Sequence, residues 1–377
     1  MLDRRTLLKT TVMGLSMIAG PASSATQQDR DQDNGSARRL GFRMPLEAER
    51  HARTFMQWPS RAAIYGSRKE LETVRTSIAL IASTIARFEP VVMLAGPDQV
   101  AAVQQTLGAH IEVWPIKTED LWCRDSGPTF VRSADGALAI SELNFNGWGN
   151  KQPHADDQRI ARRVADKLGL RVFDNGVVGE GGGVETDGAG TLLAHESSWV
   201  IPSRNRRTKA EVEGLLLEAL GAERMIWAPG VKGADITDYH IDALARFVKP
   251  GQVLIQLPRK KSTSDPWSLS AFETYEILKR AKDASGRPLD IVVIPEPDPE
   301  EIRSLSDDFV SSYVNYYVCN GAVIGAEFGD DKADAAAKDI LRQLYPDREI
   351  VSLNIDPIGE AGGGIHCATQ QQPAESP

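Results

Sequence analysis

The feature of this sequence that most constrains its fold is a recurring order of helix, short strand and tight turn. The order begins with apolar residues at helical spacing across 71–85 and a buried strand at 90–94. Later copies have helices near 157–168, 208–220, 266–284 and 333–344, followed by strands at 171–173, 224–228, 291–294 and 349–354. Hairpin glycines recur roughly every 50 to 70 residues, at Gly136, Gly188, Gly251 and Gly321. Such repetition predicts an α/β fold of units arranged radially, each packed on its neighbours.

Several other classes of protein are disfavoured. No Gly-x-Gly-x-x-Gly follows a strand and no phosphate loop is present, so a doubly wound nucleotide-binding sheet is not indicated. The formal net charge is -9 without a basic stripe, which argues against nucleic acid as a partner and suits a cationic ligand. No linker rich in Pro, Gly or Ser divides residues 41–377, so we expect one catalytic domain there.

The first 25 residues have the pattern of an export signal. Arg4, Arg5 and Lys9 precede an apolar run over 11–19, and small residues at 21–25 offer a cleavage site after Ala25. The paired arginines are typical of twin-arginine signals, and the apolar run is shorter than the ~20 residues of a membrane span. We therefore expect export to the periplasm or beyond and no stable membrane anchor. The polar residues 26–40 are expected to form a disordered lead-in.

The chain has three cysteines, Cys123, Cys319 and Cys367, so at least one thiol stays unpaired. Cys367 follows three glycines and His366, where the backbone can approach a ligand closely. A buried structural cysteine is the alternative, but the glycine-rich turn and the neighbouring histidine favour a nucleophile at Cys367.

Other segments supply a histidine and carboxylates. If His240 and Asp242 lie on a strand, their side chains share one face, although a satisfied polar pair at a strand end explains them equally well. Asp125 and Glu180 lie beside glycine-containing turns, and each serves equally well as a turn residue or as a functional group. A thiol, a histidine and several carboxylates without metal-ligand spacing suit one chemistry in particular. Carboxylates hold a planar guanidinium while a thiolate attacks its carbon and the histidine moves protons, and no cofactor is needed.

In these segments the chain resembles the agmatine deiminase and bacterial peptidyl-arginine deiminase family, from about Met44 to Pro373. The matching segments are 120–128, 144–149, 235–242, 312–317 and 363–371. The resemblance implies a single-domain, five-bladed, pseudo-symmetric α/β propeller (pentein-like) with the site at its centre. It implies Cys367 as nucleophile, His240 as acid and base, Asp125 and Asp242 as guanidinium clamps, and Trp122 and Glu180 near the substrate. The chain departs from the family at Tyr239, where Gly is usual, and at Ser203, where many members have Asn.

We expect the reaction to convert agmatine into N-carbamoylputrescine and ammonia through a thiouronium on the cysteine. The excess of acids around the motifs suits a dication, so Asp235 or Asp238 is expected to meet the distal ammonium, and Tyr239 to narrow the channel. Two alternatives remain open: an exported deiminase of free or peptide-linked arginine, and a catalytically inactive protein that binds guanidino compounds or amines. The sequence also leaves open a homo-oligomer.

Overall fold

The computed structural model describes residues 35–304, 306 and 309–375. Residues from Gly35 onward form one compact unit. The export signal predicted for residues 1–25 lies outside the described residues, as do residues 26–34 of the expected lead-in.

For residues 35–40 the expectation of disorder is wrong. They form turns in which Ala37 is fully buried. The backbone N–H of Arg38 donates to the carbonyl of Glu218 at 3.1 Å, and Phe42 N–H donates to Ala37 O at 2.8 Å. The polar composition of this segment hid the one small apolar side chain that anchors it.

Five small sheets make up the described part of the chain, and each contains an antiparallel pair followed by a parallel strand. In four units a hairpin leads into a helix and then into the parallel strand. These units are β5 (Thr129–Ser133), β6 (Leu138–Glu142), α6 (Ile160–Leu168) and β7 (Arg171–Asp174); β8 (Val184–Thr186), β9 (Thr191–His195), α8 (Lys209–Leu220) and β10 (Arg224–Ala228); β11 (Ala245–Lys249), β12 (Gln252–Leu257), α9 (Pro266–Leu278) and β13 (Asp290–Pro295); and β14 (Tyr317–Cys319), β15 (Ala322–Ala326), α10 (Asp331–Leu344) and β16 (Glu349–Leu353).

The fifth unit joins the two ends of the described chain. Its sheet contains β17 (Thr369–Pro373), β2 (His51–Gln57), β3 (Val91–Ala95) and β4 (Glu112–Pro115), with α2 (Arg68–Ile85) and α3 (Val100–Leu107) between the parallel strands. β17 runs antiparallel to β2, with Gln370 opposite Phe55. β1 (Phe42–Arg43) pairs with β5. Short helical turns connect the units: η1 (Ala62–Ile64), α4 (Cys123–Ser126), α5 (Gly147–Asn150), η2 (Asp157–Arg159), η3 (Gly181–Gly183), α7 (Glu196–Trp199), η4 (Ile241–Ala243) and α11 (Asp356–Glu360).

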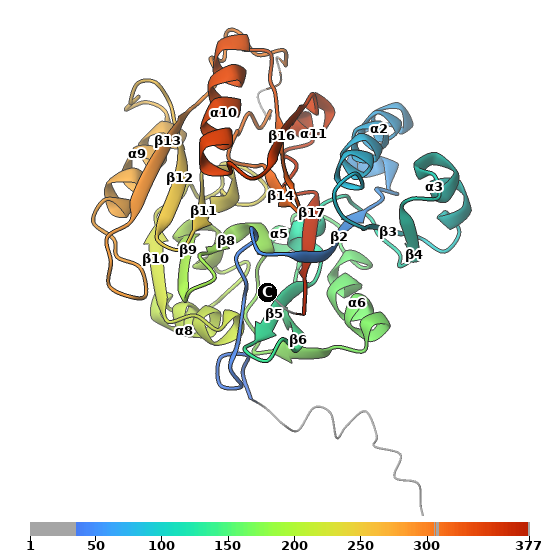
Figure 1. The fold of residues 1–377 in the computed structure, drawn as a ribbon, viewed down its shortest axis with the longest axis horizontal. Coiled ribbons are helices and arrows are strands. Elements are labelled where there is room, and N and C mark those ends of the chain that lie inside the picture. The colour runs from blue at the N-terminus through green and yellow to red at the C-terminus, as the bar shows by residue number, and fades with distance from the viewer. Residues whose placement is uncertain (1–34, 305, 307–308, 376–377) are drawn as a thin grey trace, which may run out of the picture. The chain divides into compact units, whose positions relative to one another are not determined.

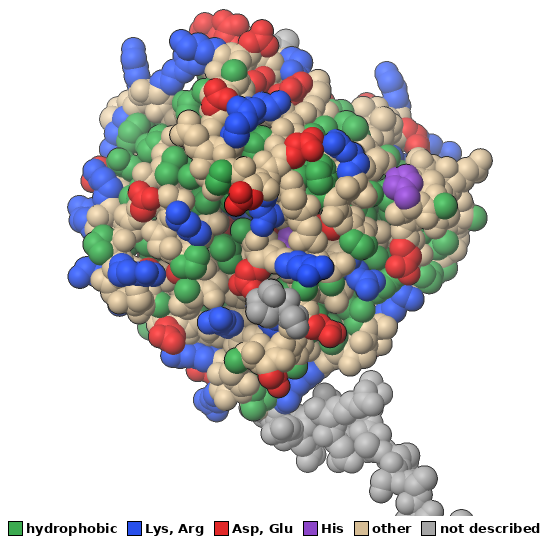
Figure 2. Space-filling view, viewed as in Figure 1, with side chains coloured by type: hydrophobic (Ala, Val, Ile, Leu, Met, Phe, Trp, Pro, Cys, Tyr) green, Lys and Arg blue, Asp and Glu red, His purple; other side chains and the backbone are tan. Residues whose placement is uncertain are grey.

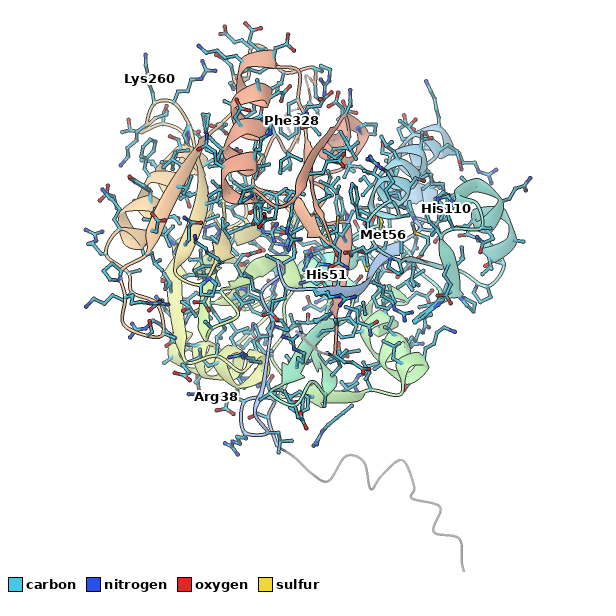
Figure 3. All side chains as sticks on the ribbon, viewed as in Figure 1. Arg38, His51, Met56, His110, Lys260 and Phe328 are labelled. Carbon is cyan, nitrogen blue, oxygen red and sulfur yellow. The ribbon has the colours of Figure 1, made fainter. Side chains whose placement is uncertain are left out.

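The five sheets surround a common centre, with the longer helices on the outside of the ring (Figure 1). The expected five-bladed α/β propeller is thereby confirmed, and the predicted hairpins fall where the turn residues placed them. The predicted helices also agree, except that the helix expected over 266–284 ends at Leu278. Figure 3 shows His51 close to the middle of the ring and the exposed His110 and Lys260 at its periphery.

Helix ends follow ordinary capping chemistry. The side chain of Ser67 accepts from Glu70 N–H at the start of α2, and Thr208 with Glu211 forms a capping box at the start of α8. On the face in Figure 2, positive and negative side chains are interspersed. Among the described helices, none has the length and apolar character needed to cross a membrane.

Candidate active site

Cys367 lies in the loop between α11 and β17, two residues before the closing strand. It is half-buried, whereas the thiols of Cys123 and Cys319 are fully buried. Its Sγ atom lies 3.1 Å from Nδ2 of Asn315 and 3.6 Å from Oδ2 of Asp242. Of the three cysteines, Cys367 is therefore the one placed beside polar groups and within reach of a ligand.

The glycines around the site are required by close approach. A Cβ atom at Gly364 would lie 2.5 Å from Asn315 Oδ1. A Cβ atom at Gly182 would lie 2.8 Å from His240 Nδ1 and 2.9 Å from both Asp125 Oδ1 and Asp242 Oδ2. The structure therefore brings His240, Asp125 and Asp242 together over the backbone of Gly182, although Asp125 comes from α4 and the other two residues come from the turn η4.

His240 and Asp242 do not lie on a strand as the sequence suggested. Ile241–Ala243 form the 3₁₀ turn η4, and His240 occupies its N-cap position with extended backbone. Their side chains converge because the tight turn, rather than a pleat, directs both toward Gly182. Ile241, between them, is fully buried.

His240 is buried between two carboxylates. Its Nε2 atom lies 3.2 Å from Glu180 Oε2, and its Nδ1 atom lies 3.6 Å from Asp125 Oδ1. Burial lowers the pKa of His240, but Asp125 and Glu180, aided by Asp242, outweigh it and raise the pKa to about 9. The ring is consequently positively charged at neutral pH.

Asp125, in the short helix α4, is fixed by two donors. Trp148 Nε1–H donates to Oδ2 at 2.8 Å, and Gly182 N–H donates to Oδ1 at 3.1 Å. Burial raises the pKa of Asp125 to about 6, although the positive charge on His240 opposes the shift. Trp148 belongs to the segment 144–149 that the sequence associated with the family without assigning it a role.

Asp242 has one oxygen held by the protein and one free. His366 Nδ1 lies 2.7 Å from Oδ2, whereas Oδ1 is buried and has no hydrogen-bond partner. Burial raises the pKa of Asp242, but the hydrogen bond and charge of His366 hold it below its usual range. A buried ionised carboxylate with an unpartnered oxygen is poised to accept an N–H from a cationic ligand.

The pKa of the Cys367 thiol is shifted in the opposite direction. Burial, followed by the negative charges of Asp242 and Asp125, raises its pKa well above the usual range. Without a ligand, therefore, the thiol is neutral at physiological pH. A cation bound between these carboxylates would offset their charge and favour the thiolate.

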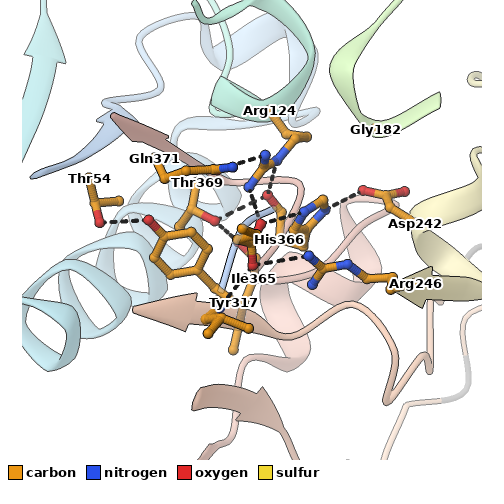
Figure 4. A network of polar contacts seen from close by, with 12 residues as sticks. Thr54, Arg124, Gly182, Asp242, Arg246, Tyr317, Ile365, His366, Thr369 and Gln371 are labelled. Carbon is orange, nitrogen blue, oxygen red and sulfur yellow. Dashed lines mark hydrogen bonds and ion pairs between the residues drawn. The ribbon is translucent and has the colours of Figure 1, made fainter. Parts of the chain in front are cut away.

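Behind Asp242 lies a network of buried charges that the sequence did not reveal (Figure 4). Glu47 is its centre, with Oε2 at 2.9 Å from both Arg124 NH2 and His366 Nε2, and Oε1 at 3.0 Å from Arg246 NH2. Burial raises the pKa of Glu47, but Arg246, His366 and Arg124 together lower it well below its usual range. Arg124 is thus committed to Glu47, Gln371 and the carbonyl of His366.

Glu180 is also tied to a buried cation. Arg204 Nε–H donates to both carboxylate oxygens of Glu180 at 2.8 Å, and Arg204 NH1 donates to Asp238 Oδ2 at 2.7 Å. Lys151 Nζ donates to the same Asp238 oxygen at 2.7 Å. Arg204 therefore links Glu180, which contacts His240, to the loop that precedes His240. No local sequence pattern predicted this role for Arg204.

The expectation that Asp235 or Asp238 meets a distal ammonium does not fit these contacts. Asp238 is already neutralised by two cations. Asp235 is exposed, and its Oδ1 accepts from the N–H groups of Thr237 and Tyr239 at 2.7 and 3.0 Å. Both carboxylates instead stabilise the loop before His240. The expectation was wrong because a count of acidic residues in the sequence does not show which of them are already paired with cations.

Tyr239 does not narrow a channel either. Its side chain is buried in the core beneath the site, with its ring centroid 4.4 Å from that of Trp267 and 4.7 Å from that of His195. Its backbone has φ of 68°, which explains why Gly suits this position in the family. Ser203 packs against Gly149 on the outer side of the same region.

An open cleft has Trp122 in one of its walls. The ring meets the backbone of Gly363 so closely that a Cβ atom there would lie 2.5 Å from it and 3.3 Å from Cys367 Cβ. The remaining walls of the cleft come from η1, α2, α11 and the loops near Gln152 and Ile236, and they include Glu70, Asp120 and Glu360 as well as Lys69. Trp122 thus lines the cleft and also packs against the turn that carries Cys367. Among the described residues, no His, Cys, Asp or Glu group has the arrangement of a metal site.

The ring of sheets with this thiol, histidine and carboxylates is that of a hydrolase of the pentein class. A family model described as Porphyromonas-type peptidyl-arginine deiminase matches residues 43–373, and the chain belongs to that family. It is 38% identical over 343 residues to a candidate agmatine deiminase of Streptomyces coelicolor, covering 89% of this chain and 99% of the relative. It is 35% identical over 361 residues to the agmatine deiminase of Stutzerimonas stutzeri, covering 89% and 97%. The solved agmatine deiminase of Enterococcus faecalis superposes with a TM-score of 0.84 at 27% identity, covering 91% and 99%.

Proposed function

We propose that this protein hydrolyses the guanidino group of agmatine to give N-carbamoylputrescine and ammonia. The observation that carries the proposal is the convergence over Gly182 of Asp125, Asp242 and His240, beside the thiol of Cys367. Two carboxylates can grip a planar cation from two sides, and the free Oδ1 of Asp242 supplies one acceptor without breaking any existing contact.

The bound guanidinium offsets the carboxylate charges that suppress ionisation of the thiol, and the thiol releases its proton to solvent. The thiolate then attacks the central carbon to give a neutral tetrahedral adduct. His240, charged at neutral pH, gives its proton to a leaving NH2 group, and ammonia departs to leave a positively charged thiouronium.

Water completes the reaction with the roles of the histidine reversed. Neutral His240 takes a proton from water, and the hydroxide adds to the thiouronium carbon. The C–S bond breaks, the thiolate is restored, and the ureido product leaves with one proton released to solvent. Asp125 and Asp242 hold the carbon in place throughout, so the protein supplies the nucleophile, the orientation of the substrate and the proton transfers.

The distribution of cations favours agmatine over arginine. An α-carboxylate would need a free positive partner, because burying that charge unpaired is costly. Near the site, Arg124 is paired with Glu47, and Arg204 and Lys151 are paired with Asp238. A substrate tail lying along Trp122 would instead enter the cleft whose walls carry three carboxylates, Glu70, Asp120 and Glu360, against one cation, Lys69.

The test is a paired measurement of ammonia release and calorimetric binding with agmatine, arginine and an arginyl peptide. Agmatine should show the highest kcat/KM. A higher kcat/KM for arginine or for the peptide would overturn the choice of substrate while retaining the deiminase. Binding of agmatine without turnover would identify a catalytically inactive binding protein instead.

We further propose that the protein acts outside the cytoplasm. The support is the pattern of Arg4 and Arg5 before an apolar run that ends at small residues near Ala25. The fold suits a system that carries folded proteins, since the cysteines described here are unpaired thiols and need no oxidation.

A further inference from the structure

The short turn α5 lies near the middle of the ring and holds its backbone in an uncommon conformation (Figure 1). Four consecutive residues have a positive φ: 66° at Gly147, 55° at Trp148, 82° at Gly149 and 64° at Asn150. For Trp148, with φ of 55° and ψ of 46°, this left-handed conformation is sterically costly, because the Cβ atom crowds the following carbonyl oxygen. Such strain persists where the surrounding contacts enforce it, and it is often found at functional sites.

The residues on either side of α5 hold it in this conformation. Asn146 Oδ1 accepts the N–H of Gly149 at 2.8 Å, and Asn146 Nδ2 donates to the carbonyl of Ser203 at 3.0 Å. On the other side of the turn, Lys151 Nζ donates to Asp238 Oδ2 at 2.7 Å. The turn is therefore tied to neighbouring loops at both of its ends.

This backbone directs the indole of Trp148 to Asp125. Nε1–H donates to Asp125 Oδ2 at 2.8 Å, and the buried ring packs edge-on against Phe145, with 5.0 Å between centroids. An indole nitrogen can only donate, and its hydrogen bond is strongest when the carboxylate is charged. The other oxygen of Asp125 accepts from Gly182 N–H. One protein donor on each oxygen leaves lone pairs on both oxygens for a guanidinium.

Asp125 needs such a donor because its surroundings disfavour its charge. The ionisable groups that face it are Glu180, Asp242, His240 and the thiols of Cys367 and Cys123. Burial is the main cause of the raised pKa of Asp125; the positive ring of His240 opposes the shift, and the two carboxylates add to it. Burial raises the pKa of both thiols, which are neutral at physiological pH. The indole stabilises the carboxylate of Asp125 without adding a positive charge that would repel a cationic ligand.

We propose that Trp148 is a positioning residue whose indole N–H keeps Asp125 turned toward the bound guanidinium and stabilises its carboxylate charge. The inference rests on the proposed function in taking Asp125 as a guanidinium clamp. The left-handed backbone of α5 serves this contact, because a right-handed turn at the same place would give the Cα–Cβ bond of Trp148 another direction.

The experiment compares Trp148→Phe with Trp114→Phe in the full chain and measures kcat/KM from pH 5 to 9, a profile that reports the ionisable groups of the free enzyme. Phenylalanine keeps an aromatic ring and removes the N–H donor. Trp114 is a matched control, because it is also buried and its Nε1–H also donates to a carboxylate, Glu112 Oε1, at 2.6 Å. This pair lies in β4, at the edge of its sheet.

In Trp148→Phe, the acid limb of the profile should move from about pH 6 to about pH 7, the shift expected when a charged group loses one hydrogen bond. The loss of kcat/KM should therefore be about fivefold larger at pH 6 than at pH 8. Trp114→Phe should keep the profile of the parent. A loss in Trp148→Phe that is the same at every pH would indicate a purely structural role and overturn the assignment, as would an equal shift in Trp114→Phe.

A second measurement needs neither substrate nor a folded variant. In the parent protein labelled with ¹⁵N in its tryptophans, one indole N–H resonance should move with a midpoint near pH 6 as Asp125 ionises. This resonance should persist in Trp114→Phe and be absent from Trp148→Phe. If Trp148→Phe does not fold, the parent decides, and the lack of any such resonance overturns the proposal. A parent that turns over no guanidino compound would refute the proposed function and leave this result standing.

Discussion

His366 Nδ1 lies 2.7 Å from Asp242 Oδ2, and the other nitrogen of the same ring lies 2.9 Å from Glu47 Oε2. The imidazole therefore transmits the position of the buried ion network to the carboxylate that faces the sulfur. Because Oδ2 is held in this way, Oδ1 is left free for the ligand.

Replacing His366 should therefore lower catalytic activity, although the side chain of His366 contacts Asp242 and Glu47 and not the substrate. We expect His366→Ala to lower kcat/KM for agmatine by about a hundredfold, since a misplacement of ~1 Å at a reacting centre has an effect of that size. His366→Gln retains a donor and should lose less. His51→Gln is the control, because His51 is equally buried between Glu89 and the carbonyl of Glu47 but lies apart from the thiol. Equal losses of kcat/KM in the two proteins would refute the role given to His366.

Cys367→Ser should reduce turnover by about a thousandfold or more, because a hydroxyl is a far weaker nucleophile than a thiol at the same position. Circular dichroism and thermal melting should match the parent. Cys123→Ser and Cys319→Ser should keep kcat but lose about 1 kcal/mol of unfolding free energy, since each places a hydroxyl in a fully buried apolar site. Comparable inactivation in either variant would point to the wrong thiol.

Asp238→Asn should act mainly on stability and on kcat. The change leaves Arg204, which is fully buried, and Lys151 without their shared carboxylate, and the free energy of unfolding should fall by about 3 kcal/mol. Arg204 also holds Glu180 against His240, so kcat should fall with it. Denaturant unfolding and steady-state kinetics measure the two effects, with Asp235→Asn as the exposed control. A large rise in KM alone, at unchanged stability, would restore the ammonium-binding role for Asp238.

The pH dependence follows from two raised pKa values. Activity should rise through about pH 6 as Asp125 ionises and fall through about pH 9 as His240 loses its proton. For both groups the folded pKa exceeds the unfolded value, so the stability each contributes is full at low pH and is lost as pH rises through the folded pKa. The share from Asp125 should disappear between about pH 4 and 6, and the share from His240 between about pH 6.5 and 9. A rate profile that is flat from pH 5 to 10 would contradict both assignments.

Replacing Arg4 and Arg5 together by Lys should keep the protein in the cytoplasm at full length. The parent should appear outside the cytoplasm without residues 1–25, as judged by intact mass. A full-length parent confined to the cytoplasm would show that these residues are not an export signal.

The sequence predicted the ring of units well because helix periodicity and turn residues are local properties of the chain. Helical spacing across 71–85 and the turn residues before Gly188 and Gly321 depend on their immediate neighbours. It was less informative where a role depends on a distant partner. The sequence suggested Asp238 as an unpaired acid, whereas the structure pairs it with Arg204 and Lys151. No sequence pattern pointed to Glu47, because its partners lie far from it in the chain: Arg124, Arg246 and His366.

Backbone geometry accounts for the other differences. His240 and Asp242 were expected on a pleated strand, yet a 3₁₀ turn brings them together. Alternating side chains and a tight turn both place residues two apart near each other, and the sequence alone does not separate the two. Tyr239 was expected at a channel because it adjoins His240, but its positive φ turns the side chain into the core.

The pairing of β17 with β2 has a consequence for when the enzyme becomes active. The nucleophile lies two residues before β17, and that strand completes a sheet whose other strands are contributed by residues 51–115. The other four sheets are complete by Leu353, so their hydrogen bonds can form before the reactive sulfur and β17 join the ring. The thiol of Cys367 reaches His240 and the two aspartates only when β17 pairs with β2. A chain that lacks this segment would therefore be inactive. The enzyme is therefore active only when β17 is in place. Proteolysis that removes β17 and Cys367 would abolish activity while the remaining blades are still folded.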